Sequence, residues 1–286
     1  MSIAKELQAR LTKSKISYEE LYGILQHQSI DLSTHTSKQT RHSNQTKTSD
    51  FKCDFSSDEV KNSFSIEEAY LQVELLRAQG LPLESSGDAY FLAHNERTWR
   101  EQEFCFVDIE TTGSKPDTHQ IIEIGAIKWK NGEILGRFSE LIYAYFVPES
   151  ITQITQIDTK MLENARSTKE VLRDFKQFLA QSVFVAHNVG FDYSFVSYHL
   201  EELGFGELLN PKLCTIDLAK KTILARRYSL KFLNEFLGIN TPTSHRAYAD
   251  ALTALRIFEI ASLCLPNSVC TTQDMIDFSK NANIRC

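Results

Sequence analysis

The sequence lacks long apolar runs, cysteine pairs and an excess of positive charge. No apolar segment is long enough to span a membrane, and the N-terminus shows no signal-peptide pattern. The six cysteines include no Cys-x-x-Cys pair and no spacing typical of zinc sites, so we interpret them as reduced thiols of a cytoplasmic protein. The net charge of −6 argues against a broad basic field for holding nucleic acid, whereas it permits local binding through metal ions.

Residues 33–50 contain no aliphatic side chain and no Phe, Tyr or Trp. Such a segment cannot bury enough apolar surface to offset the entropy lost on ordering. We therefore predict a flexible linker over residues 33–63, and we favour a simple spacer over a basic nucleic-acid-binding arm.

The residues on either side of this linker predict small helical regions. Residues 1–32 contain two short helices, and a capping box at Ser65-Ile-Glu-Glu68 begins a third that Gly80 ends. A short strand follows at residues 88–92. This order resembles a winged-helix module, but we expect a small, mainly helical accessory region over residues 64–100.

Two carboxylates follow a strongly apolar strand at residues 104–110. Asp108 and Glu110 are two residues apart, so both side chains point to the same face of the strand. Partly buried carboxylates repel each other, and a divalent cation such as Mg²⁺ or Mn²⁺ removes that penalty. The alternative is an edge strand with two solvated acids.

The following residues predict an α/β domain over residues 101–264, with a C-terminal tail at 265–286. Strands at 121–129 and 134–142 flank Asn131-Gly132, a strong hairpin pattern. Further strands at 183–187 and 212–216 alternate with helices at 168–179, 191–203, 229–237 and 246–264. We expect a mixed sheet, in which a three-stranded antiparallel meander and parallel strands are flanked by helices.

Two later motifs add acids and a histidine. His187-Asn188-Val-Gly-Phe191-Asp192 lies where a strand ends and a helix begins, so Asp192 is expected to face the same crevice as Asp108. Alternatively, Asp192 only complements the helix dipole. Asp250 follows His245 by five residues, so they share a face only if His245 sits at or before the helix N-terminus. A capping or surface role is the alternative for this histidine.

These motifs resemble those of the DnaQ-like 3′→5′ exonucleases of the DEDDh type. The resemblance runs from about Phe104 to Leu263 and rests on Asp-Ile-Glu-Thr-Thr-Gly, Ile-Ile-Glu-Ile-Gly-Ala and His-Arg-Ala-x-x-Asp. It implies an RNase H-like sheet, and within the family it is similar to the proofreading epsilon subunits of bacterial DNA polymerase III. Two departures are Gln156, where relatives have glycine, and Cys214, where aspartate is common.

The resemblance also implies roles for individual residues. The acids that bind two divalent metal ions, Mg²⁺ or Mn²⁺, would be Asp108, Glu110, Asp192 and Asp250, and His245 would be the general base. The residues that contact the terminal nucleotide would be Thr111, Thr112, Gly113, Asn188 and Phe191. A scaffold without activity would lack some of these acids, and all are present.

The implied function is release of nucleoside monophosphates from single-stranded DNA 3′ ends, as proofreading for a replicative polymerase. The alternative is a stand-alone enzyme that trims RNA 3′ ends. The implied partner is the DNA polymerase III alpha subunit. In the tail, Gln273 to Phe278 have the spacing of bacterial sliding-clamp-binding peptides, and an amphipathic helix capped by Thr272 is the alternative.

Overall fold

The structure, a computed structural model, describes residues 3–26, 65–242 and 245–280. The chain divides into two compact units: unit 1 comprises Met1–Leu76 and Glu84–Phe91, and unit 2 comprises Arg77–Leu83 and Leu92–Cys286. The predicted linker lies outside the described residues, and the predicted domain boundaries stay predictions. None of the described helices is long and apolar enough to cross a membrane.

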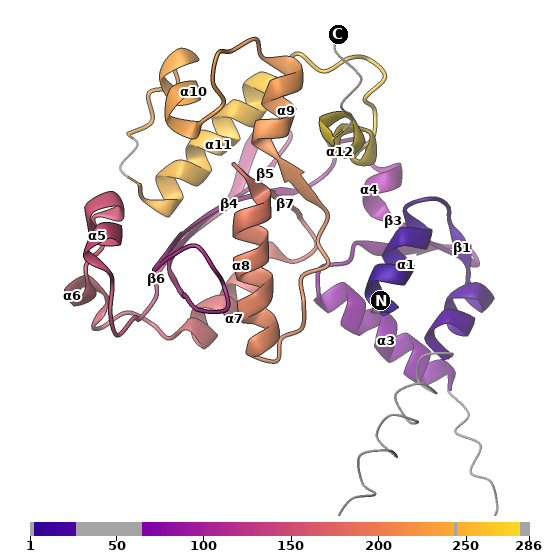
Figure 1. The fold of residues 1–286 in the computed structure, drawn as a ribbon. Helices are drawn as coiled ribbons and strands as arrows, with labels where there is room; N and C mark the ends of the chain where they lie inside the picture. The colour runs from indigo at the N-terminus through magenta and orange to yellow at the C-terminus, as the bar shows by residue number, and fades with distance from the viewer. Residues whose placement is uncertain (1–2, 27–64, 243–244, 281–286) are drawn as a thin grey trace, which may run out of the picture. The chain divides into compact units, whose positions relative to one another are not determined.

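In the residues that the structure describes, unit 1 combines helices with a small three-stranded sheet (Figure 1). Its elements are α1 (Ile3–Leu11), β1 (Ile16–Ser17), a helix over residues 18–26, α3 (Ile66–Ala78), β2 (Leu83–Ser86) and β3 (Ala89–Leu92). The strands lie in the order β1-β3-β2, and β1 pairs antiparallel with β3. The capping box of Ser65 and Glu68 begins α3 as predicted. The described part of unit 1 thus contains strands as well as helices.

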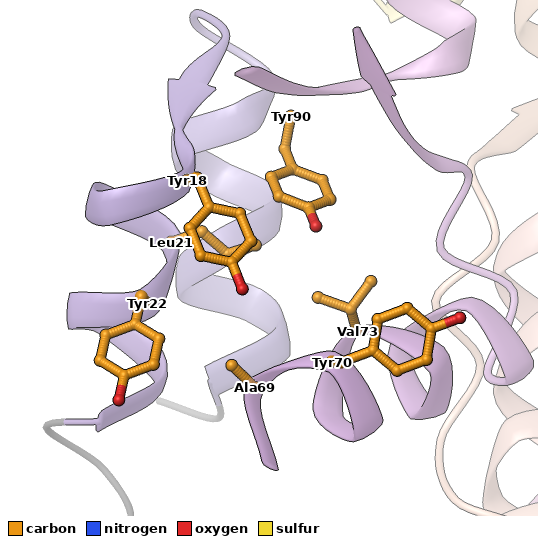
Figure 2. Close-up of a pocket in the computed structure, with 7 residues that line it drawn as sticks. All are labelled: Tyr18, Leu21, Tyr22, Ala69, Tyr70, Val73 and Tyr90. Carbon is orange, nitrogen blue, oxygen red and sulfur yellow. The ribbon is translucent and has the colours of Figure 1, made fainter. Parts of the chain in front are cut away.

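The third helix of unit 1 is more acidic than basic and leaves several apolar side chains exposed. Ala69 and Val73 are buried, whereas Ile66, Tyr70 and Leu71 are exposed. Figure 2 shows a small pocket that α3 shares with tyrosines from the helix of residues 18–26 and from β3. Residues 66–76 include three glutamates and neither lysine nor arginine. The one basic residue of the helix is Arg77 in its last turn, and its Nε donates to the Leu83 carbonyl at 2.8 Å.

Unit 2 is built on a five-stranded mixed sheet. Its strands are β4 (Phe104–Thr111), β5 (Ile121–Lys130), β6 (Glu133–Leu141), β7 (Val183–Ala186) and β8 (Lys212–Cys214), in the order β6-β5-β4-β7-β8. The β4–β5 and β5–β6 pairs are antiparallel, and the β4–β7 and β7–β8 pairs are parallel. Asn131 and Gly132 form the hairpin turn with positive φ angles of 47° and 90°. The predicted fold class is confirmed.

Helices cover both faces of this sheet (Figure 1). The first face packs against α7 (Thr168–Leu179) and α8 (Val189–Glu202), and the second against α9 (Thr215–Thr222), α11 (Ala247–Ser262) and α12 (Thr272–Lys280). Shorter helices are α4 (Ala93–Glu96), α5 (Glu149–Thr155), α6 (Thr159–Leu162) and α10 (Leu230–Phe236). Residues of β4 alternate between the two faces of the sheet. Cys105 and Val107 belong to the hydrophobic cluster on the first face, with α7 and α8, whereas Phe104 and Phe106 belong to the cluster on the second face.

Two local predictions are corrected by the structure. The strand predicted over residues 212–216 ends at Cys214, and Thr215 already begins α9. The C-terminal helix is capped by Thr271 rather than Thr272, because the Thr271 hydroxyl accepts a hydrogen bond from the Asp274 N–H and the Asp274 carboxylate accepts from the Thr271 N–H. Gln156, one of the noted departures from the family pattern, takes the left-handed conformation after α5, with a φ of 59°, where glycine is the residue most often found.

The predicted clamp-binding peptide is part of the core. Met275, Ile276 and Phe278 are buried against the sheet as members of the same cluster as Phe104 and Phe106. A clamp could take up these side chains only if α12 left the core. The structure therefore supports the alternative, an amphipathic terminal helix.

Candidate active site

The carboxylates of β4 face α11. Asp108 and Glu110 have the same parity as Phe104 and Phe106, whose rings lie 5.0 Å and 5.2 Å from that of Phe258 on α11. The two acids stand near the carboxyl end of β4, where its parallel neighbour β7 also ends. This is the usual ligand position of an α/β sheet.

Asp250, in the first turn of α11, completes a group of three acids. Asp108, Glu110 and Asp250 each offer a carboxylate oxygen, and these oxygens lie within 4.8 Å of one another. Oδ1 of Asp250 is buried and has no hydrogen-bond partner. A buried carboxylate oxygen without a partner is costly unless a cation binds it, so this acid group could hold metal ions.

Glu123 fixes the start of α11, a role that sequence reasoning did not assign. Its side chain is 2% exposed, and its Oε1 accepts hydrogen bonds from Nε and Nη2 of Arg246 at 3.0 Å and 2.7 Å. Its Oε2 accepts from the Ala247 N–H at 3.0 Å, which caps the helix. Glu123 lies opposite Glu110 in the β4–β5 ladder. In the sequence, Glu123 stands out as an acid inside the apolar strand at 121–129, within the motif Ile-Ile-Glu-Ile-Gly-Ala.

Gly125 lets α11 approach the sheet. A Cβ atom at this position would lie 2.2 Å from the Tyr248 nitrogen and 2.3 Å from the Ala247 carbonyl carbon. Both are backbone atoms, so no side-chain rotation could relieve the clash. Gly125 is the residue that pairs with Asp108 in the β4–β5 ladder. Glycine at position 125 therefore determines how closely α11, and with it Asp250, approaches Asp108.

Asp192 lies at the start of α8, beside β4 but outside the three-acid group. The Ile109 N–H donates to Asp192 Oδ1 at 3.2 Å, and the side chain is 4% exposed. Asn188, with a φ of 82°, turns the chain from β7 into α8. The preceding His187 is structural: its Nε2 donates to the Tyr228 carbonyl, so its Nδ1 accepts from Thr215, and burial lowers its pKa to about 4.

His245 is exposed and lies two residues before α11, which is the position that the His-to-Asp spacing requires. Its φ of 47° is left-handed, so the chain turns sharply into the helix. Burial raises the pKa of Asp250, the positive charge of His245 lowers it, and Glu123 raises it. Their Coulombic interaction links His245 with the acid group.

The acid group holds protons more tightly than ordinary carboxylates do. Desolvation and the charges of Asp192, Asp250 and Glu110 raise the pKa of Asp108 well above its usual value. Desolvation, then repulsion from Asp250 and Glu123, raises the pKa of Glu110 to about 8. Desolvation raises the pKa of Asp192 to about 7. A bound cation would reverse these shifts, because it favours the charged carboxylates.

The predicted nucleotide-contacting residues lie at the end of β4, in the turn after it, or at the start of α8. The Thr111 hydroxyl donates to the Gly113 carbonyl at 2.7 Å, and the Thr112 hydroxyl accepts from the Gln120 N–H at 3.1 Å. These bonds fix the turn after β4. Phe191 packs on Phe195, with their ring centroids 4.9 Å apart.

Fold and acid group together define a nuclease-like centre, and the comparisons identify its family. Residues 105–258, more than half of the chain, match the sequence profile of the RNase_T exonuclease family, so the chain belongs to this family. The predicted likeness to DnaQ-like exonucleases is confirmed.

Two relatives show where this domain occurs. DNA polymerase III subunit epsilon of Aquifex aeolicus is 34% identical over 157 residues, which is 54% of this chain and 78% of that protein. The PolC-type DNA polymerase III of Thermotoga maritima is 37% identical over 165 residues, 57% of this chain but only 12% of that protein. The chain thus matches a small part of the PolC-type relatives.

A solved structure supports the fold alone. Exonuclease I of E. coli, in complex with a dT13 oligonucleotide, superposes with a TM-score of 0.53 at 14% identity, over 57% of this chain and 42% of that one. At this identity the likeness concerns the arrangement of helices and strands.

Proposed function

We propose that this chain is a metal-dependent 3′→5′ exonuclease that releases nucleoside monophosphates from single-stranded DNA ends. The proposal rests on the group formed by Asp108, Glu110 and Asp250 at the carboxyl end of the central strand. Such a group without a cation is strained by repulsion, and the chain belongs to an exonuclease family.

In this proposal, two divalent cations, Mg²⁺ or Mn²⁺, are held by the acids Asp108, Glu110, Asp192 and Asp250. When bound, the cations neutralise charge at the scissile phosphate and acidify the attacking water. Hydrogen bonds position two of these four acids. Asp192 is fixed by the Ile109 N–H, and Asp250 is fixed through the contact of Glu123 with the start of α11.

His245 is the general base of the proposed reaction, and its imidazole accepts the proton of the attacking water. Its place in the loop before α11 leaves the ring accessible to a substrate. Thr111, Thr112 and Gly113 lie under the terminal nucleotide, and Asn188 and Phe191 shape its pocket.

We also infer a proofreading role in replication. The relation to the epsilon subunit of Aquifex aeolicus supports association with a polymerase alpha subunit in the bacterial cytoplasm. Co-purification of the full chain with that subunit tests this role. Separate migration of the two proteins in size-exclusion chromatography at micromolar concentration would contradict it.

The activity is tested with 5′-labelled single-stranded DNA and RNA of the same sequence, in Mg²⁺, Mn²⁺ or EDTA. We expect shortening of the DNA from its 3′ end and release of nucleoside monophosphates, which EDTA and the substitution Asp108→Asn abolish. A strong preference for RNA would favour the trimming of RNA 3′ ends. Failure to degrade either strand with any divalent cation would refute the proposal.

A further inference from the structure

A groove adjoins the proposed active site at Thr112. Its volume is about 590 Å³, within the range of about 300–1,000 Å³ that is common for ligand pockets. It is formed by the turn after β4, the loop between β6 and α5, and one side of α8. The lining residues that carry the argument are Thr112, His119, Tyr145, Phe146, Tyr198 and His199.

One wall of the groove presents two aromatic rings to solvent. Tyr145 is 87% exposed and Phe146 is 65% exposed. The residues on either side of them are buried: Ala144 and Val147 belong to the small core cluster beneath this loop. The loop backbone is also anchored, because the Val147 N–H donates to the Thr159 hydroxyl at 3.0 Å. The loop therefore holds Tyr145 and Phe146 outward on a fixed backbone.

The opposite wall is held by hydrogen bonds and close packing. Gln120 donates through its side chain to the Tyr143 carbonyl at 3.1 Å, and His199 Nε2 donates to the His119 carbonyl at 3.2 Å. Gly113 leaves room for the His119 ring, since a Cβ at residue 113 would lie 2.1 Å from His119 Cδ2. The groove is thus preformed next to the turn that follows the proposed catalytic strand.

The chemistry of the groove suits bases rather than phosphates. Among the described residues that line it there is no lysine or arginine, whereas Asp117 and Glu202 are present. Phosphates would be repelled by these acids. The flat faces of nucleobases, by contrast, stack on aromatic rings in a way that tolerates any sequence. Only unpaired bases can turn a face toward such a wall, because base pairs in a duplex are covered by their neighbours.

We propose that this groove binds the unpaired nucleobases next to the 3′-terminal nucleotide, with Tyr145 and Phe146 as their stacking surfaces. The inference rests on the proposed exonuclease function and adds a site for the penultimate part of the substrate. It makes the groove a determinant of the preference for single strands.

The test compares two substrates that fill different parts of the site. The p-nitrophenyl ester of thymidine 5′-monophosphate occupies only the terminal position, whereas a short oligothymidylate also enters the groove. For each protein we take the ratio of kcat/KM for the oligonucleotide to kcat/KM for the ester. Damage to the fold or the acid group lowers both values, whereas loss of stacking lowers the ratio.

We expect the ratio to fall about tenfold in Tyr145→Ala and in Phe146→Ala, the size typical of one stacked base. Tyr145→Phe keeps the ring and should keep the ratio. Leu263→Ala is the matched control, because Leu263 is 84% exposed at the end of α11 and does not line the groove. An unchanged ratio in both alanine variants, or an equal fall in the control, would overturn the inference.

Binding separates this inference from the proposed function. If the wild-type chain hydrolyses neither substrate, the exonuclease proposal fails. Fluorescence anisotropy of a labelled oligothymidylate still tests the groove, and we expect about tenfold weaker binding by Tyr145→Ala. If the wild type and Tyr145→Ala bound the oligothymidylate with equal affinity, the proposed binding of bases in the groove would be refuted. Tighter binding of a blunt duplex than of the single strand would also refute it.

Discussion

Without divalent cations, the stability of unit 2 should fall as the pH rises. The raised pKa values of Glu110, about 8, and Asp192, about 7, mean that the folded protein retains protons that the unfolded chain has already released. When the folded state binds more protons, the free energy of unfolding decreases with pH. The stability present near pH 5 is therefore lost progressively as the pH rises to about 8.

The size of this loss follows from the shift of Glu110. Its pKa rises from 4.5 to about 8, and each unit corresponds to about 1.4 kcal/mol. Glu110 is partly exposed, so solvent screening and relaxation reduce the effect to about 2 kcal/mol. For a unit of this size we expect Tm to decrease by about 4–8 °C from this residue.

Tryptophan fluorescence is a selective assay for this effect. The chain has two tryptophans, and Trp99 and Trp129 both lie in the core of unit 2. Thermal unfolding in EDTA across this pH range should give a falling Tm for the wild type and a flatter curve for Glu110→Gln. Glu133→Gln is the control, because Glu133 is exposed in the β5–β6 hairpin.

Mg²⁺ should stabilise the wild type more at high pH than at low pH, since it binds the ionised acids. The reasoning would be refuted by a Tm in EDTA that stays level or rises from about pH 5 to about pH 8. If Tm fell equally steeply with pH in Glu110→Gln and in the wild type, the loss of stability would come from groups other than Glu110.

Four further substitutions test the site and the fold. Asp192→Ala should abolish divalent-dependent nuclease activity while the circular dichroism spectrum is retained, and near-wild-type turnover would remove this acid from the proposed metal site. His245→Ala should lower kcat about 10²–10⁴-fold and flatten the acid limb of the pH–rate profile; an unchanged profile would exclude it as the base. Gln156→Gly should stabilise unit 2 by about 1 kcal/mol in urea unfolding, because glycine relieves the left-handed strain. Glu123→Gln should destabilise it by about 1–3 kcal/mol in the same assay, because the charged hydrogen bonds to Arg246 are weakened.

The sequence was most informative where spacing alone fixes geometry. Asp108 and Glu110 share a face because strand side chains alternate, and the five-residue step from His245 to Asp250 placed the histidine before the helix. Both predictions match the described positions of these residues. Their chemical roles remain predictions that the substitutions above test.

Contacts between residues far apart in the sequence, and short helices, could not be predicted from the sequence, for physical reasons. The contact of Glu123 with Arg246 joins residues 123 positions apart, which no local periodicity records. The start of α9 was missed because Leu213 to Ile216 are mostly apolar and include the β-branched Thr215, a pattern that strands and buried helix starts share. The buried Thr215 hydroxyl bonds to His187 where the backbone turns from β8 into the helix. Helices as short as α6 show too few turns for a periodic pattern.

The burial of α12 determines where the enzyme region can be cut. Residues 97–99 exchange hydrogen bonds with residues 270–272, and Met275, Ile276 and Phe278 fill the core beneath the sheet. A fragment limited to residues 101–264 would lose both contacts and expose a continuous apolar surface. We expect such a fragment to aggregate, whereas a fragment from Arg77 to Lys280 keeps these contacts and also the hydrogen bond from the Leu209 N–H to the Gln79 carbonyl. The segment that matches the exonuclease family, residues 105–258, is therefore shorter than the piece of chain that we expect to fold on its own.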